Sequence, residues 1–184
     1  MAISWKRLRN NPDYIYRVKR EQVTDDVIDY VLSLPNIEIE FLKRFVKTFG
    51  NNNYLAQKVI EREDFDILVQ YLPLHFDELP QETVQRILDK MDSNKTRLNL
   101  NIIEDKIIKK YPSLLKQYLR TEDADSIKTN TEYFGWYIDT KTCPKEEWQE
   151  IIELYLDKID YKDISPFFFD DPIASEVILD NNFE

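Results

Sequence analysis

The sequence predicts an all-α protein, either an irregular helical bundle or a short α-solenoid of helix pairs. Three stretches carry apolar residues at the same helical offsets, and each follows residues that favour a helix start. Glycine occurs only twice in the 184 residues, whereas most tight β-hairpin turns need a residue that tolerates positive φ. A mixed α/β fold is therefore the less favoured alternative.

The three helix-forming stretches place apolar side chains at offsets 0, +3, +4 and +7, which is one face of a helix. The sets are Val27, Tyr30, Val31 and Leu34; Val84, Ile87, Leu88 and Met91; and Trp148, Ile151, Ile152 and Tyr155. Start signals precede them at Thr24 with Asp25 and Asp26, at Pro80 with Glu82, and at Pro144 with Glu146 and Glu147. A hydroxyl cap accepts a hydrogen bond from an unpaired first-turn amide, and negative charge interacts favourably with the helix dipole there. A first-turn proline has no amide hydrogen to leave unpaired.

A second apolar run follows each of these stretches, which predicts helix pairs. The runs cover residues 39–49, 103–119 with a break at Pro112, and 173–178, and shorter helices are expected at 54–60 and 65–72. Helix pairs that bury their apolar faces only by stacking on neighbours are typical of α-solenoids. The helical period gives the same offsets in an ordinary bundle, so both architectures stay open.

Length and charge predict a single helical domain over residues 1–184, with a basic, aromatic N-terminal segment at residues 1–20. The cations of this segment are Lys6, Arg7, Arg9, Arg17, Lys19 and Arg20. Against Asp13 they give +5, so the net charge of −10 leaves −15 on the other 164 residues. The segment interleaves cations and aromatic rings, as single-strand binders do, but the acidic remainder repels nucleic acid. We therefore do not expect direct nucleic-acid binding.

The sequence contains no catalytic or cofactor signature. His75 is the only histidine and Cys143 the only cysteine, which is too few for the usual zinc sites, and no local motif marks them as a nucleophile and its base. No glycine-rich loop is present to hold a phosphate. The segment 123–132 begins like a calcium loop, but Lys128 stands where that loop needs glycine. We expect no enzyme activity, no metal and no cofactor.

Two aromatic clusters fall outside the helical period. Tyr133, Phe134, Trp136 and Tyr137 surround Gly135, and Phe167, Phe168 and Phe169 follow Pro166. Consecutive aromatic residues cannot all face one core from a regular helix, so we expect some of them to be exposed and to contact a partner. The alternative is a loop that fills the core from several sides.

The chain also lacks the marks of secretion or membrane insertion. Its first residues include no apolar signal region, no uncharged run approaches the roughly 18 residues of a membrane helix, and one cysteine cannot form an internal disulfide. These features predict a cytoplasmic protein without membrane contact.

One segment resembles a known class of proteins. CPKEEWQEIIELYLDKIDYKDIS, residues 143–165, is similar to the degenerate α-helical repeats of phages and large DNA viruses. Earlier copies depart from it: LPQETVQRILDKMDSNK keeps the helix and Asp-Lys-Met-Asp but not the aromatic residue, and VTDDVIDYVLSLPNIEIE keeps neither. The resemblance covers about a quarter of the chain. It implies a viral protein that acts by protein interaction, in the host cytoplasm, without catalytic residues.

The expected function is therefore a non-enzymatic protein–protein interaction module, which as a phage or viral protein would inhibit or modulate a host protein. An alternative is an acidic mimic of nucleic acid that blocks a nucleic-acid-binding protein, which would need an ordered row of carboxylates. A metal-dependent carboxylate enzyme is the least favoured hypothesis.

Overall fold

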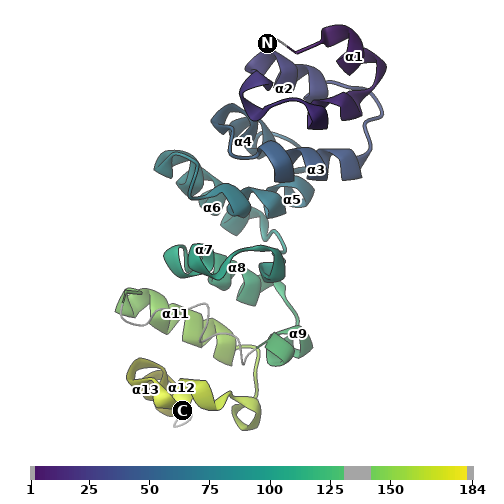
Figure 1. Cartoon of the computed structure of the whole chain (residues 1–184). Helices are drawn as coiled ribbons and strands as arrows, with labels where there is room; N and C mark the ends of the chain where they lie inside the picture. The colour runs from purple at the N-terminus through teal and green to yellow at the C-terminus, as the bar shows by residue number, and fades with distance from the viewer. Residues whose placement is uncertain (1–2, 131–141, 182–184) are drawn as a thin grey trace. The chain divides into compact units, whose positions relative to one another are not determined.

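The computed structural model describes residues 3–130 and 142–181, and these residues form helices joined by turns, without strands (Figure 1). The predicted all-α class is confirmed. Contacts divide the chain into two compact units, Met1–Thr83 and Val84–Glu184. The single domain expected from the sequence stays a prediction. No helix in the described part of the chain is both long and apolar enough to cross a membrane.

The first unit consists of short helices that follow one another closely. They are α1 (Trp5–Asn10), the 3₁₀ helices η1 (Pro12–Arg17) and η2 (Arg20–Gln22), α2 (Asp25–Leu32), α3 (Ile39–Phe49), α4 (Asn53–Ile60), α5 (Phe65–Leu68) and the 3₁₀ helix η3 (Val69–His75). The helix expected at 65–72 changes to 3₁₀ geometry after Leu68. Pro73 lies inside η3 and lacks an amide hydrogen, which suits the end of an α-helix rather than its middle.

The core of the first unit is centred on the apolar face of α3, where Leu42, Phe45, Val46 and Phe49 are buried. The ring of Phe45 lies 5.3 Å from that of Phe49 and 6.3 Å from that of Phe41, measured between centroids. Tyr16 of η1 stacks on Phe49 at 6.1 Å. This row of rings helps to hold the N-terminal segment. Leu8 and Ile15 are fully buried, so residues 3–20 pack against the unit rather than extend from it.

His75 is buried and contacts the last turn of α3. Its Nε2 donates to the carbonyl oxygen of Lys47 at 3.0 Å, and its Nδ1 lies 3.5 Å from a carboxylate oxygen of Glu78. Gly50 follows α3 with an ordinary φ of −63°, so the backbone does not require glycine there. A Cβ atom at position 50 would, however, lie 2.6 Å from Cδ2 of His75. The absence of a side chain at Gly50 makes room for the imidazole.

The described part of the second unit also consists of helices. Helix α6 (Gln81–Asn94) contains the boundary between the units and is followed by η4 (Leu100–Ile102), α7 (Asp105–Lys110), α8 (Ser113–Thr121), α9 (Ala124–Asn130), α11 (Lys145–Leu156), η6 (Tyr161–Asp163), α12 (Pro166–Asp170) and α13 (Pro172–Asn181). Helix α11 packs against both α8 and α13, so it forms the middle layer of this unit (Figure 1).

Ion pairs join α6, α8 and α11 on one side of the second unit. Nζ of Lys116 lies 2.9 Å from Glu150 and 3.3 Å from Glu147. Arg120 pairs with Asp92 and, at 2.7 Å, with Glu150. Burial alone would lower the pKa of Lys116, but the carboxylates of Glu150 and Glu147 outweigh that effect and raise it. Much of the acidic charge on this side is therefore neutralised within the protein.

Trp148 anchors the C-terminal helices of the second unit and is fully buried. Its ring stacks on Phe168 of α12 at 5.9 Å, and Phe168 in turn lies 4.5 Å from Tyr155. The indole Nε1 donates to Oδ1 of Asp171 at 2.9 Å. The same oxygen accepts from the backbone amides of Ile173 and Ala174, so Asp171 caps the start of α13 while it binds Trp148.

Candidate interaction surface

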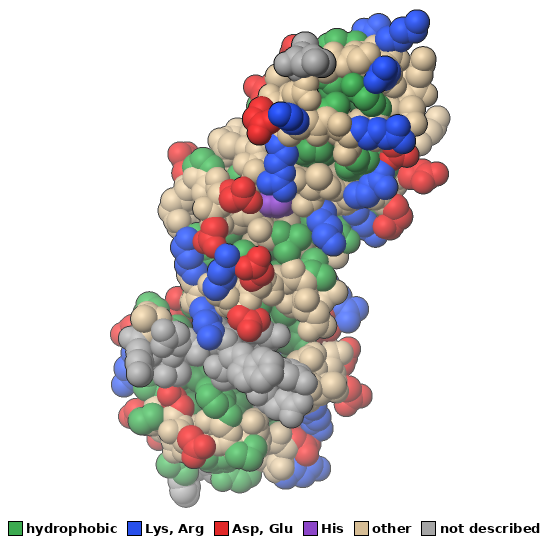
Figure 2. Space-filling model, viewed as in Figure 1, with side chains coloured by type: hydrophobic (Ala, Val, Ile, Leu, Met, Phe, Trp, Pro, Cys, Tyr) green, Lys and Arg blue, Asp and Glu red, His purple; other side chains and the backbone are tan. Residues whose placement is uncertain are grey.

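Large apolar side chains reach the surface mainly near the C-terminal end of the second unit. Tyr161, Phe169 and Leu179 are 54%, 42% and 48% exposed. Over residues 3–130 and 142–181, Ile67 of α5, at 39%, is the only other large apolar residue in the exposed class. Figure 2 shows apolar side chains at the surface of the second unit. Exposed apolar groups that lie together are a common mark of a binding surface.

The three phenylalanines of α12 point in different directions because successive residues of a helix are rotated by about 100°. Phe168 is buried against Trp148 and Tyr155, so the prediction that it contacts a partner is wrong. Phe167 is half-buried and lies 5.5 Å from Phe168. Phe169 is exposed, as expected of a contact residue. The other predicted aromatic cluster, Tyr133, Phe134, Trp136 and Tyr137, lies outside the described residues.

Tyr161 and Phe169 form an exposed pair of rings. Their centroids are 6.2 Å apart and the rings are nearly perpendicular, at 82°, an arrangement that aromatic pairs favour. Tyr161 is positioned by η6, which a salt bridge ties to α9: Nζ of Lys128 lies 2.7 Å from Oδ2 of Asp163. This contact lowers the pKa of Asp163 and raises the pKa of Lys128.

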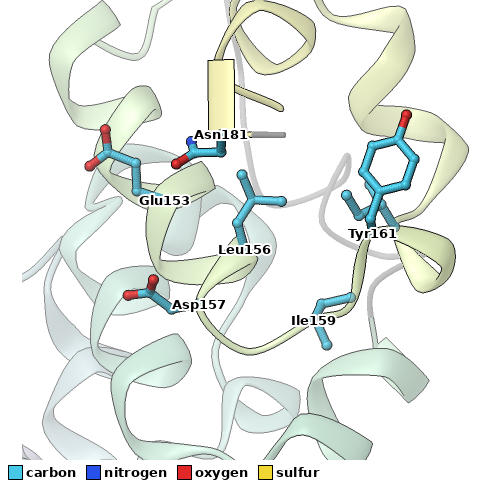
Figure 3. Close-up of a pocket in the computed structure, with 7 residues that line it drawn as sticks. Glu153, Leu156, Asp157, Ile159, Tyr161 and Asn181 are labelled. Atoms are coloured by element: carbon cyan, nitrogen blue, oxygen red, sulfur yellow. The ribbon is translucent and has the colours of Figure 1, made fainter. Parts of the chain in front are cut away.

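A hollow of about 470 Å³ opens beside Tyr161. It lies where η6 and the last turn of α13 meet the end of α11, and its lining residues are Glu153, Leu156, Asp157, Ile159, Tyr161, Ile164 and Asn181. Ile159 and Ile164 are buried and Leu156 is half-buried, so polar groups supply most of the lining that stays accessible. Figure 3 shows Leu156 between the carboxylates of Glu153 and Asp157 on one side and the ring of Tyr161 on the other. We call Phe169 and the residues of this hollow the C-terminal surface.

The polar groups of the C-terminal surface are hydrogen-bond acceptors for the most part. Glu153 and Asp157 are exposed, and neither carboxylate forms an ion pair or hydrogen bond within the part of the chain that the structure describes. Asn181 uses its Nδ2 to donate to the carbonyl of Val177 at 2.9 Å, which leaves its Oδ1 as an acceptor. The nearby cation Lys158 donates to the carbonyl of Glu122 instead, and it does not line the hollow.

The basic segment is spread over α1, η1 and η2. All six of its cations are exposed. Arg7 lies 5.8 Å from the ring centre of Tyr14, and Arg20 lies 3.9 Å from a carboxylate oxygen of Glu78. The lining of a second hollow, of about 810 Å³, includes two of the cations and two acidic residues, Arg17, Lys19, Glu21 and Asp26. The second hollow therefore carries charges of both signs, and the six cations do not form a single site.

Sequence reasoning did not single out Tyr161, Glu153, Asp157 or Asn181. One signal was present: Tyr161 stands in the run KIDYKDIS, where an aromatic residue follows directly on an acidic turn. Turn residues are usually exposed, so a large ring among them indicates a contact residue. The hollow itself gives no sequence signal, because it depends on how the chain returns past the end of α11.

No cluster of three or more histidine, cysteine, aspartate or glutamate side chains that could hold a metal occurs in the described ranges. Comparisons with protein-family models, with curated proteins and with solved structures found no match to the chain.

Proposed function

We propose that the chain is a non-enzymatic interaction module that binds another protein through the C-terminal surface. The observation that carries the proposal is the exposed ring pair of Tyr161 and Phe169 beside the hollow. Aromatic side chains next to a depression dominate the binding energy of many interfaces, because they remove a large apolar area from water at low entropic cost.

The C-terminal surface overlaps in sequence with the segment that resembles viral repeats. Six of the seven residues that line the hollow fall within residues 143–165, the segment that resembles the helical repeats of phages and large DNA viruses. The resemblance, and not the hollow, is what favours a viral protein that inhibits or modulates a host protein in the host cytoplasm. In that case Tyr161 and most of the lining belong to the repeat unit, while Phe169 and Asn181 follow it in the chain.

The acidic mimic of nucleic acid has less support. A mimic needs a row of carboxylates that are available to a basic groove. On α11 the carboxylates of Glu147 and Glu150 are paired with Lys116, and Glu150 is also paired with Arg120. Only part of the acidic charge is therefore free to act as a mimic of phosphate.

The proposal predicts that binding depends on the two exposed rings. We expect the double substitution Tyr161→Ala, Phe169→Ala to weaken capture of the partner from a lysate of the native host by about tenfold or more, because exposed hot-spot rings each contribute on the order of 1–2 kcal/mol or more. The free energy of unfolding by urea should fall by no more than about 1–2 kcal/mol, since both rings are partly exposed. The readout is the amount of each captured protein, determined by quantitative mass spectrometry.

Ile67→Ala is the matched control, because Ile67 is a similarly exposed apolar residue in the first unit. This variant should retain the same proteins as the unchanged chain. The proposal fails if the double variant captures them equally well, or if Ile67→Ala loses them to the same extent.

A further inference from the structure

A third hollow, of about 260 Å³, opens between α6 and α8 of the second unit, and none of its lining residues belongs to the C-terminal surface. The polar side chains that α6 and α8 contribute to its lining include Gln85, Asp89, Asp92, Lys116, Gln117 and Arg120. Within each helix these residues are mostly three or four positions apart, so they share one face of the helix. We call this site the α8 hollow.

Gln117 is the most deeply buried polar residue of the α8 hollow, with only 3% of its surface exposed. Its Nε2 donates to the carbonyl oxygens of Met91 at 3.0 Å and Thr96 at 2.9 Å. These two hydrogen bonds fix the amide group, so its Oε1 cannot turn toward another donor without breaking them. Among the buried side-chain nitrogen and oxygen atoms of residues 3–130 and 142–181, Oε1 of Gln117 is the only one without a hydrogen-bond partner. A buried acceptor in this state costs stability until a donor reaches it.

The cations of the α8 hollow are already neutralised by the chain. Lys116 is bound by Glu147 and Glu150, and Arg120 is bound by Asp92 and Glu150. Three carboxylates therefore surround two cations, and neither cation is left to attract an anionic ligand.

Asp89 adds a further carboxylate to the same lining. It forms no ion pair in the part of the chain that the structure describes, and one of its oxygens accepts a hydrogen bond from Nε2 of Gln85 at 2.7 Å. The α8 hollow therefore combines an excess of negative charge with an unpaired amide oxygen, and both favour a ligand that donates hydrogen bonds and carries positive charge. No set of three or more side chains suited to a metal lies within the described ranges, so an organic cation fits this lining better than a metal ion.

We infer that the α8 hollow binds a primary ammonium group, which donates to Oε1 of Gln117 and to the carboxylate of Asp89. An ammonium is compact and has three N–H donors, which suits an acceptor as deeply buried as this amide oxygen. The volume is below the roughly 300–1,000 Å³ of sites for drug-sized ligands, so the group is carried by a short alkyl chain. The carrier is either a free small amine or a lysine side chain of another protein. This site goes beyond the proposed function, which uses a different surface.

Nuclear magnetic resonance on the full chain, with isotope-labelled glutamine side chains, tests this inference. The probe is n-butylammonium, and tetramethylammonium is the control because it has the same charge but no N–H donor. We expect n-butylammonium to shift the side-chain amide signal of Gln117 in a saturable way, with a Kd of roughly a few millimolar or lower. Tetramethylammonium should bind at least about tenfold more weakly, because it cannot satisfy the amide oxygen.

Two single substitutions localise the binding. Asp89→Asn removes the unpaired charge at an exposed position and should weaken binding of n-butylammonium by about tenfold. Glu146→Gln removes a charge from an exposed residue outside the lining and should leave the affinity within about twofold of the unchanged chain. Tyr161→Ala, Phe169→Ala should also bind n-butylammonium normally, so this test is independent of the proposed function.

The absence of a saturable shift at Gln117 would overturn the inference and would leave its Oε1 to a water molecule. Equal affinity for tetramethylammonium, or for Asp89→Asn and Glu146→Gln, would overturn it as well, because general attraction to an acidic chain would then explain the binding. Two further probes distinguish the carriers. Tighter binding of a short diaminoalkane supports a free amine, whereas tighter binding of lysine with both backbone ends blocked supports a lysine side chain of another protein.

Discussion

Replacing Trp148 with alanine should lower the free energy of unfolding of the second unit by about 3–5 kcal/mol, the usual cost of deleting a large buried ring. The indole is fully buried, stacks on Phe168 and donates to Asp171, so the substitution removes packing from α11, α12 and α13 together. It also leaves the cap of α13 without one of its hydrogen-bond partners. Urea unfolding followed by far-ultraviolet circular dichroism measures the change.

Trp148→Phe is the control for this prediction. It keeps a ring beside Phe168 but loses the hydrogen bond to Asp171, so we expect a smaller loss, of about 1–2 kcal/mol. A loss below about 1 kcal/mol in Trp148→Ala would be ordinary for a surface position. Such a result would mean that Trp148 is not the packing centre of the C-terminal helices.

The corresponding substitution in the first unit, Phe45→Ala, should cost about 3–5 kcal/mol as well. Phe45 is fully buried and lies between Phe41 and Phe49 in the row of rings that also holds Tyr16. The cavity should loosen α3 and the N-terminal segment that packs on it. Amide hydrogen exchange in α3 and η1 should therefore speed up, and this is the measurement that locates the effect.

Phe45→Leu provides the comparison, because leucine keeps most of the apolar volume and should lose no more than about 1.5 kcal/mol. If Phe45→Ala left exchange in η1 unchanged, the row of rings would not be what fastens the N-terminal segment to its unit. That outcome would contradict the packing described for α3.

The fold class and most helix starts were accessible from the sequence, because they depend on local patterns. Helices α2, α6 and α11 begin directly after Thr24, Pro80 and Pro144, as predicted, although the Thr24 side chain makes no cap hydrogen bond and Pro144 precedes the first turn. Helix α2 nevertheless ends at Leu32, so Leu34 lies outside it. The reason is local too: Pro35 disfavours helical geometry at the residue before it. The choice between bundle and solenoid was not accessible, since the period is the same in both.

The candidate surface was only partly predictable, because exposure depends on tertiary packing. The run of three phenylalanines indicated that some rings would be exposed, but not which ones. Phe168 is buried and Phe169 is exposed because of the way α12 sits against Trp148 and Tyr155. The hollow depends on contacts between residues far apart in the sequence, which no local pattern records.

Site-specific photocrosslinking tests the central claim most directly. A photoreactive phenylalanine analogue at position 169, introduced into the otherwise unchanged chain and produced in the cells where the protein naturally occurs, should crosslink to one protein. The crosslinked peptide identifies the segment that it contacts. The same analogue at position 67 should give no such product. Crosslinking of that same protein from position 67 but not from position 169, or no product from position 169, would contradict binding through the C-terminal surface.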